Sequence, residues 1–382
     1  MYRKHACCKV NAGDKEMTKK GNTVDISSID KNFVVPGVGE YDLIFTDARN
    51  SKIIALEGLK WMPEKGDYRR IPGTFTAENT SAGVITLGWH TAGGAVRFRS
   101  DSPVIVLRGK LGPGCDMSHM PRAGSCGFDS YSFSGNGFPR YQKTFQPGPG
   151  LVDYKCVIGL NPERKMLSWI VNLPLYGGVN TLEVGVEAGS RLLPPKAHKV
   201  KKPILFYGSS ITQGGCASRP GNMYPSHLCR KLDAEQINLG FSGNGKGEKA
   251  VAEAIASLDL AAFVYDYDYN APSPEHLQAT HEPFFQIIRK AHPHLPVIMI
   301  SKCNNNIPES DGPRREIIRR TYLNAVEAGD ENVYFIDGLT LFGKEDQDAC
   351  TVDGCHPNDL GFYRMYKTIL PVLRRALKNR KK

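Results

Sequence analysis

Hydrophobic and polar residues follow one pattern in the first half of the chain and another in the second. Between Tyr41 and Glu187, short apolar segments, several of them alternating with polar residues, are separated by Gly, Pro, Asn and Asp. Alternation places every second side chain on one face of a strand, so this part is predicted to be all-β, a sandwich of the jelly-roll type. The clearest segments are residues 83–87, 95–99, 104–107 and 181–186.

After residue 203, continuously apolar strands alternate with helical segments. The apolar runs are residues 204–207, 237–241, 262–265, 297–300 and 333–336, and the helical segments are residues 246–258, 283–291 and 360–377. Strands that are apolar throughout are buried on both faces, and helices in the connections supply that cover. The fold class is therefore predicted to be α/β, a three-layer α/β/α domain with a parallel, flavodoxin-like sheet that follows the all-β part.

The stretch Leu192–Lys202 separates the two patterns. Its sequence, LLPPKAHKVKK, is rich in Pro and Lys and suits neither helix nor strand. We predict an accessory β-domain at residues 35–195 and an α/β domain at residues 196–382. Residues 1–34 are polar, lysine-rich and without hydrophobic period, and they are predicted to be flexible.

Charge and hydropathy exclude several classes of partner. The formal net charge is +10, but six positive charges lie between Arg374 and Lys382 and four between Lys196 and Lys202. Such clusters are typical of solvated ends, and no nucleic-acid recognition motif accompanies them. No apolar run reaches the about 18 residues of a membrane span, and the first residues lack the apolar stretch of a signal peptide. We expect neither nucleic acid nor membrane as a partner.

The cysteines indicate the compartment. Ten are scattered along a chain that is too large to need disulfide staples, and none forms a Cys-x-x-Cys pair. No His/Cys spacing matches a structural zinc site. We expect reduced thiols in a cytoplasmic protein, with no metal and no organic cofactor.

Polar groups suited to acyl chemistry follow four of the predicted strands. Ser210 lies in a Gly-bounded turn after the first strand, Gly243 in the glycine-rich segment 240–247 after the second, and Asn270 after the third; Asp353 and His356 follow the last. In an open α/β sheet ligands bind beyond the carboxyl ends of the strands, so these groups are expected to meet at one edge.

Each residue type fits a step of acyl transfer. A serine hydroxyl is a poor nucleophile until a nearby base removes its proton, and histidine is best suited to that task. A carboxylate three residues before the histidine can hold the imidazole in the right tautomer, as Asp353 would for His356. Backbone N–H groups at Gly243 and the amide of Asn270 can stabilise an oxyanion.

These residues resemble the four sequence blocks of the SGNH or GDSL hydrolases, over roughly residues 203–375. The resemblance implies that Ser210 is the nucleophile and that Asp353 and His356 complete the triad. It also implies that Gly243 and Asn270 form the oxyanion hole with the backbone of Ser210. Two blocks depart from the usual pattern: Ser209 stands where many members have Asp, and Asp268-Tyr269-Asn270-Ala271 stands in place of Gly-x-Asn-Asp.

The first half resembles the β-rich domain, named for a Gly-x-Asp-Leu-Tyr motif, that precedes one branch of this family. The matching segments are residues 127–131, with Ser130 in place of the motif's leucine, and residues 173–179. The family implies a serine esterase for short acyl groups, with acetyl esters of carbohydrates as the expected substrates. An acyltransferase with the same triad, or a carbohydrate-binding protein without catalysis, stays open as an alternative.

Three other motifs suggest different functions, but each lacks part of the pattern that its function requires. Residues 243–247 resemble part of a dinucleotide-binding fingerprint, but the third glycine comes one residue early and the segment follows the second strand. Cys216 and Cys355 lie near the serine and the histidine without forming an obvious dyad, and they are expected to be buried filler. His119 and Asp129 occupy a loop of the β-rich half and are not predicted to be catalytic.

Overall fold

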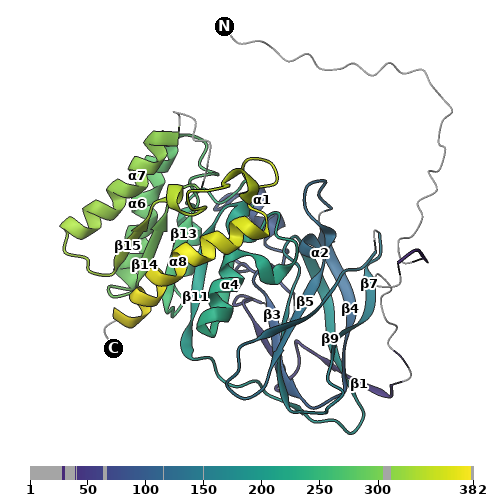
Figure 1. Ribbon diagram of the computed structural model, residues 1–382. Coiled ribbons are helices and arrows are strands. Elements are labelled where there is room, and N and C mark those ends of the chain that lie inside the picture. The colour runs from purple at the N-terminus through teal and green to yellow at the C-terminus, as the bar shows by residue number, and fades with distance from the viewer. Residues whose placement is uncertain are drawn as a thin grey trace, which may run out of the picture. The chain divides into compact units, whose positions relative to one another are not determined.

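Two antiparallel sheets form the first part of the chain and one parallel sheet forms the second, as the computed structural model shows (Figure 1). The structure describes residues 28–30, 39, 41–62, 67–114, 116–148, 150–303 and 311–379. The described residues from Tyr41 onward belong to one compact unit, so the predicted division at residue 195 stays a prediction. The predicted flexible segment 1–34 lies outside the described residues, apart from residues 28–30.

The β-rich part is a sandwich. One sheet has the strand order β1-β9-β4-β7, with β1 (Leu43–Asp47), β4 (Val104–Gly114), β7 (Asp153–Leu160) and β9 (Gly177–Glu187). The other has the order β10-β3-β8-β5-β6, with β2 paired to β3; its strands are β2 (Ala55–Glu57), β3 (Ala95–Ser100), β5 (Phe128–Phe133), β6 (Arg140–Phe145), β8 (Leu167–Asn172) and β10 (Leu192–Leu193). Their inner faces meet in a core that includes Phe98, Trp169 and Val184.

One predicted strand of this part is a helix. Residues 83–87 fall within the helix α1 (Ala82–Leu87). Ser81 caps this helix, because its side chain accepts a hydrogen bond from the backbone N–H of Val84. A five-residue apolar run fits one strand or one short helix equally well, and the serine cap decides for the helix. A second short helix, α2 (Arg122–Ser125), precedes β5.

The second part confirms the predicted three-layer α/β/α fold. All five predicted strands are present, as β11 (Val200–Gly208), β12 (Ala234–Gly240), β13 (Ala262–Asp266), β14 (Val297–Ile300) and β15 (Val333–Ile336). They pair in parallel in the order β12-β11-β13-β14-β15. From β11 the chain first continues to β12 on one side and then crosses to β13 on the other side. The direction of winding therefore changes at β11, and a ligand is expected at the carboxyl end of this strand.

Helices cover both faces of this sheet. Apolar residues of α4 (Tyr224–Leu232) and α8 (Asp359–Asn379) pack on one face, and those of α5 (Lys249–Ala256), α6 (Pro274–Ala291) and α7 (Gly312–Glu327) pack on the other. Two further short elements matter for the site, α3 (Ser210–Gln213) and the 3-10 turn η6 (Asp348–Cys350). Residues 192–202 were predicted to be irregular, but the last three of them belong to β11, which starts at Val200. Val200 pairs with Ala234 of β12.

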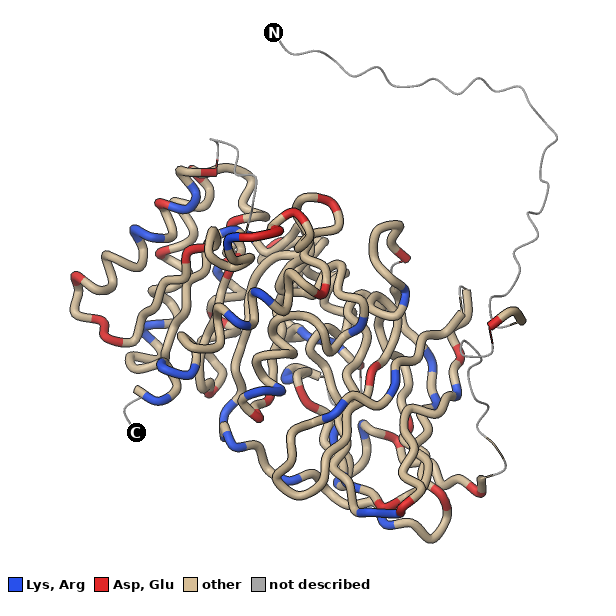
Figure 2. The backbone as a smooth tube through the Cα atoms, viewed as in Figure 1, with Lys and Arg blue, Asp and Glu red and all other residues tan. Residues whose placement is uncertain are grey.

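Charges of both signs are interspersed over the described chain (Figure 2). Among the described residues, no helix is both long and apolar enough to span a bilayer.

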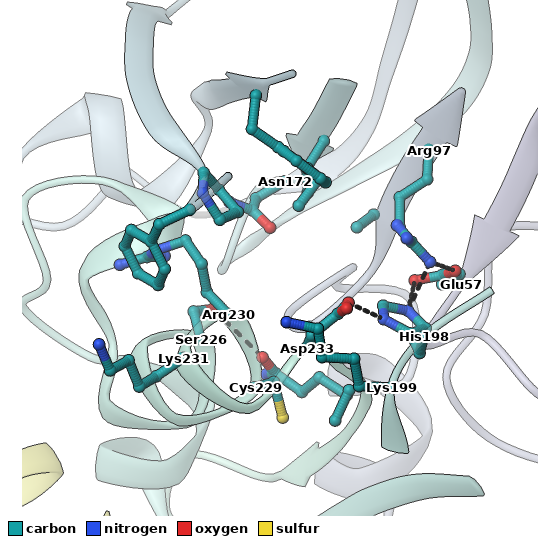
Figure 3. A pocket seen from close by; sticks show the side chains of 18 of the residues that line it. Glu57, Arg97, Asn172, His198, Lys199, Ser226, Cys229, Arg230, Lys231 and Asp233 are labelled. Carbon is teal, nitrogen blue, oxygen red and sulfur yellow. Dashed lines mark hydrogen bonds and ion pairs between the residues drawn. The ribbon is translucent and has the colours of Figure 1, made fainter. Parts of the chain in front are cut away.

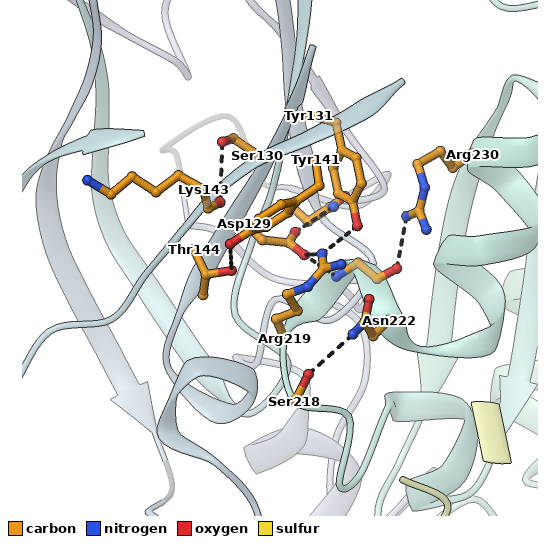
Figure 4. Close-up of polar contacts among 12 residues, drawn as sticks. Asp129, Ser130, Tyr131, Tyr141, Lys143, Thr144, Ser218, Arg219, Asn222 and Arg230 are labelled. Atoms are coloured by element: carbon orange, nitrogen blue, oxygen red, sulfur yellow. Dashed lines mark hydrogen bonds and ion pairs between the residues drawn. The ribbon is translucent and has the colours of Figure 1, made fainter. Parts of the chain in front are cut away.

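An ion pair between a buried carboxylate and a partly exposed arginine joins the β-sandwich to the α/β part (Figure 4). The Asp129 side chain, on β5, is fully buried, and its Oδ2 accepts hydrogen bonds from Arg219 Nη1 at 2.6 Å and from Gly221 N at 2.9 Å. Its Oδ1 accepts a hydrogen bond from Asn172 Nδ2 at 2.8 Å. The arginine also lies 4.4 Å from the ring centre of Tyr141. The aspartate of the Gly-x-Asp motif thus anchors the loop that follows α3.

We expect Asp129→Ala to lower the free energy of unfolding by about 3–5 kcal/mol, because it leaves Arg219 and two further donors without their acceptor. The exposed pair Lys110–Asp153, at 3.5 Å, is the matched control, and Asp153→Ala should cost less than about 1 kcal/mol. Urea unfolding of the three proteins measures both values. Equal losses in the two variants would contradict the anchoring role of Asp129.

A second polar contact between the two parts lines a cavity of about 380 Å³ (Figure 3). His198 lies between two carboxylates, with Nε2 at 3.0 Å from Glu57 Oε2 and Nδ1 at 2.9 Å from Asp233 Oδ1. Arg97 Nη1 donates to Glu57 Oε1 at 2.8 Å. Burial alone would lower the pKa of His198, but the hydrogen bonds to Asp233 and Glu57 outweigh it and raise the pKa. When His198 is protonated, two cations balance two carboxylates in this network.

Candidate active site

Ser210 occupies the first position of α3, immediately beyond the carboxyl end of β11. The preceding residue, Ser209, caps the helix, because its side chain accepts a hydrogen bond from Ile211 N. Gly208 is required by close packing: a Cβ there would lie 1.9 Å from Oδ1 of Asp266. The local sequence therefore forces a tight turn from strand to helix, and Ser210 is 8% exposed at its start.

The structure brings Ser210, His356 and Asp353 into one hydrogen-bonded chain. Ser210 Oγ lies 2.9 Å from His356 Nε2, and His356 Nδ1 lies 2.7 Å from Asp353 Oδ2. Both distances are those of good hydrogen bonds, although 146 residues separate the serine from the histidine. The predicted strand-end convergence of these three residues is therefore present in the fold.

Asp353 is held as a carboxylate. Burial by itself would raise its pKa, but hydrogen bonds from the backbone and ring of His356 and from the backbone of Cys355 outweigh it and lower the pKa to about 2. Its Oδ1 accepts from His356 N at 2.7 Å and from Cys355 N at 3.0 Å. Asp353 thus carries its charge near neutral pH and orients Nδ1–H of the imidazole, which leaves Nε2 as the acceptor.

Gly243 lies in a turn after β12, with φ at +68°. A Cβ at this position would meet no atom within 4 Å, so the left-handed backbone and not the available space favours glycine. Asn244 N and Gly245 N both donate to the carbonyl of Phe241, which closes the turn. Asn270 Oδ1 accepts from Gly245 N at 3.3 Å, so its amide Nδ2 is left as a donor.

Comparisons with known proteins agree with this geometry. Residues 201–374 match the model of the GDSL-like lipase/acylhydrolase family, and residues 43–192 match GxDLY, the N-terminus of SGNH-hydrolase-type esterases. A Bacteroides ovatus protein described as a GDSL-like lipase is 31% identical over 88% of this chain and 98% of that chain, with a TM-score of 0.78. The chain belongs to the GDSL-like lipase/acylhydrolase family. It is accordingly a carboxylic ester hydrolase by class.

Two other solved structures share the fold of this GDSL-like hydrolase. A salicylyl-acyltransferase from a tetracycline biosynthetic pathway is 19% identical over 88% of this chain and 98% of that chain, with a TM-score of 0.73. An acetyl xylan esterase from the rumen bacterium Butyrivibrio proteoclasticus is 13% identical over 88% of this chain and 99% of that chain, with a TM-score of 0.55. A search of curated protein sequences gave no match.

Two residues that the sequence did not single out hold the Gly243 turn of the GDSL-like hydrolase. Gln213, on α3, accepts from Ser242 N at 3.0 Å and donates to the carbonyl of Leu175 at 3.1 Å. Arg70 is fully buried and donates to the carbonyl of Gly240 at 2.9 Å, and its burial lowers its pKa to about 9. Buried, fully bonded polar side chains of this kind rigidify a loop. Neither residue carries a sequence signal, because its partners lie on distant segments.

Two further carboxylates, those of Asp266 and Asp268, lie at and just after the end of β13. Asp266 accepts hydrogen bonds from the hydroxyls of Thr212 and Tyr224, and burial raises its pKa to about 8. Asp268 Oδ2 accepts from Lys302 N at 2.9 Å, and burial raises its pKa to about 6. Within the described chain, neither carboxylate contacts His356. Both brace the loops around β13 in the described structure.

Thiols and a second imidazole surround the triad. Burial raises the pKa of Cys216 to about 12 and also raises the pKa of Cys355, so both thiols are neutral near pH 7. Neither is therefore poised as a nucleophile. His119, in the loop of the β-rich part before α2, places its ring centre 5.7 Å from that of His356. Asp129, from the same part of the sequence, lies instead in the ion pair with Arg219.

A groove of about 430 Å³ adjoins the Gly243 turn. Its lining comes from α1, from the β-rich part and from the turn: Ala82, Gly83, Thr86, Leu87, Met117, Tyr176, Ser242 and Asn244. The Tyr176 hydroxyl donates to the backbone carbonyl of Ser210 at 3.4 Å, so one residue of the lining contacts the turn that carries the serine. α1 packs closely on the turn, because a Cβ on Gly83 would lie 2.1 Å from Asn244 Oδ1. The β-rich part thus builds one wall of the groove.

Proposed function

We propose that this GDSL-like protein is a serine esterase that hydrolyses short acyl esters, acetyl esters of carbohydrates foremost, through an acyl-enzyme on Ser210. The observation that carries the proposal is the hydrogen-bonded chain from Ser210 Oγ through His356 to Asp353, at 2.9 and 2.7 Å. A serine paired with an oriented neutral imidazole is the arrangement that activates a hydroxyl for attack on a carbonyl.

In the first half of the reaction, Ser210 Oγ attacks the ester carbonyl while His356 Nε2 takes its proton. The negative charge that develops on the carbonyl oxygen is stabilised by the N–H groups of Ser210 and Gly243 and by Asn270 Nδ2. Asp353 stabilises the imidazolium that forms. The proton then passes from His356 to the leaving alcohol as the bond to the acyl carbon breaks.

In the second half, a water molecule attacks the acyl group on Ser210. His356 Nε2 takes the proton of the water and returns it to Ser210 Oγ as the acid leaves. The same donors stabilise the second oxyanion, because the acyl carbonyl has kept its position. Besides the ester and the water, the proposed cycle uses only the side chains and N–H groups named above.

The shape of the groove supports the proposal that the substrate carries a short acyl group. It is open along its length, so a long acyl chain laid in it would stay partly in water and gain little of the about 0.8 kcal/mol that full burial of each methylene supplies. Thr86, Ser242 and Asn244 offer hydrogen-bonding groups for sugar hydroxyls. The fold shared with an acetyl xylan esterase also supports a carbohydrate substrate.

We expect kcat/KM for aryl acetate to exceed that for aryl octanoate by at least about tenfold, because the added methylenes find no enclosed pocket. Butyrate should lie between them. The matching test on the alcohol side compares acetate release from acetylated xylo-oligosaccharides and from a simple alkyl acetate at equal concentration. A preference for octanoate would contradict the short-acyl assignment, and equal rates on the two acetates would contradict the carbohydrate assignment.

Acyl transfer to an alcohol acceptor is the second candidate, and the apolar side chains of Leu87, Met117 and Tyr176 in the groove favour it. An apolar wall can hold an organic acceptor and exclude water from the acyl-enzyme. The fold shared with a salicylyl-acyltransferase is consistent with this outcome. Product analysis in the presence of candidate alcohols separates the two: a new ester indicates transfer, and free acid alone indicates hydrolysis.

A further inference from the structure

Three side chains with metal-binding atoms converge at the mouth of the active site. His119 comes from the β-rich part, Cys216 from the turn after α3, and His356 from the loop before α8. Their ligand atoms all lie within 4.8 Å of one another. In a tetrahedral zinc site, bonds of about 2.0–2.3 Å place the ligand atoms somewhat closer together than this, so the site closes only when the side chains move closer to one another.

Two of these residues have no other bonding role in the described structure. His119 is exposed and forms no hydrogen bond within the described residues; its ring faces that of His356. Cys216 is 3% exposed and adopts φ of +75°, a conformation that side chains other than Asn, Asp and Gly rarely take. Such a strained backbone at a buried thiol beside a catalytic group calls for a function.

The third residue is already arranged as metal-bound histidines are. Zinc-binding histidines generally donate their second ring N–H to a carboxylate, which fixes the tautomer and makes the free nitrogen a better ligand. His356 has this partner, since Nδ1 lies 2.7 Å from Asp353 Oδ2. Its Nε2, which lies 2.9 Å from Ser210 Oγ, is therefore the ring nitrogen left to bind a metal, and a metal bound there would replace the hydrogen bond from the serine hydroxyl.

We propose that His119, Cys216 and His356 form a Zn²⁺ site that reversibly switches the hydrolase off. A thiolate and two imidazoles form a ligand set that suits zinc, with a fourth position left for water. On binding, the Cys216 thiol releases its proton to solvent, and no atom changes oxidation state. The inhibitory consequence rests on the proposed function, because the metal occupies the Nε2 lone pair that would otherwise accept the proton of Ser210.

The test measures inhibition of aryl acetate hydrolysis by Zn²⁺ at free concentrations set by a chelator. The full-length wild type should be inhibited and should recover when the chelator is in excess. His119→Gln and Cys216→Ser should keep the basal rate, and their inhibition constants should rise at least about tenfold, because even the outer partners of a zinc site are worth about 10- to 100-fold in affinity. Thermal unfolding checks that both variants are folded.

Matched controls are a second cysteine and a second histidine outside the cluster. Cys355→Ser removes a thiol next to His356, and His294→Gln removes an exposed imidazole on a distant loop. Both variants should keep the wild-type inhibition constant. Unchanged zinc sensitivity in His119→Gln and Cys216→Ser, or loss of sensitivity in either control, would overturn the proposed site.

A readout that does not depend on catalysis separates this site from the proposed function. Co²⁺ bound by a thiolate gives a charge-transfer absorption band, which should appear on titration of the Ser210→Ala protein and be absent from its Cys216→Ser derivative. If Ser210→Ala kept full activity, the proposed function would fail while the cobalt band still reported the metal site. If the band were missing, the metal site would fail while the triad stood.

Discussion

Ser210→Ala is expected to abolish covalent labelling by a fluorophosphonate and to lower kcat by at least about a thousandfold, because no other group can take the place of the nucleophile. Ser210 is only 8% exposed, and the single hydrogen bond of its side chain among the described residues is to His356, so the fold should be unaffected. Mass spectrometry of the labelled wild type should locate the adduct on the peptide that contains Ser210.

Ser209→Ala is the matched control, one residue away. It removes the cap of α3 and should lower stability by about 1 kcal/mol, but the labelling of Ser210 should persist. Labelling of Ser210→Ala at another residue would mean that the nucleophile lies elsewhere. Unfolding curves of both variants show whether a loss of labelling reflects chemistry or a loss of structure.

His356→Ala and Asp353→Asn are expected to impair hydrolysis by different routes. The first removes the base, and the second keeps the imidazole but allows the amide to hold it in the wrong tautomer, which by analogy with serine proteases costs about 10⁴-fold in kcat. KM should change far less than kcat, because both groups act mainly in the transition state. Steady-state kinetics on aryl acetate measure each parameter.

Asp348→Asn serves as the control for the carboxylate, since it lies exposed in η6 on the same loop and should leave kcat unchanged. Near-full activity of Asp353→Asn would require another carboxylate, and Asp266 and Asp268 would be the next to test. Their present partners, Thr212 and Tyr224 for one and Lys302 for the other, turn them away from that role. A fully active His356→Ala would disprove the proposed triad.

The pattern of hydrophobic residues was enough to predict most strands of the fold. The five parallel strands can be predicted because most of their residues are apolar and most are buried. Residues 83–87 were misassigned, since a short apolar run does not distinguish a strand from a helical turn, and the Ser81 cap is only one polar residue. The start of β11 at Val200 was missed because neighbouring prolines and lysines obscure it.

The sequence by itself predicted the chemistry of the candidate site. Ser210, Gly243, Asn270, Asp353 and His356 each follow a predicted strand, and parallel strands bring their carboxyl ends to one edge. Only the tertiary structure decided what surrounds them: Gln213 and Arg70 bracing the turn, α1 forming a wall of the groove, and His119 facing His356. The physical reason is that these contacts depend on how the β-rich part packs against the α/β part. The contact of Asp129 with Arg219, 90 residues apart, is one example, because a pair so distant in the chain leaves no local pattern in the sequence.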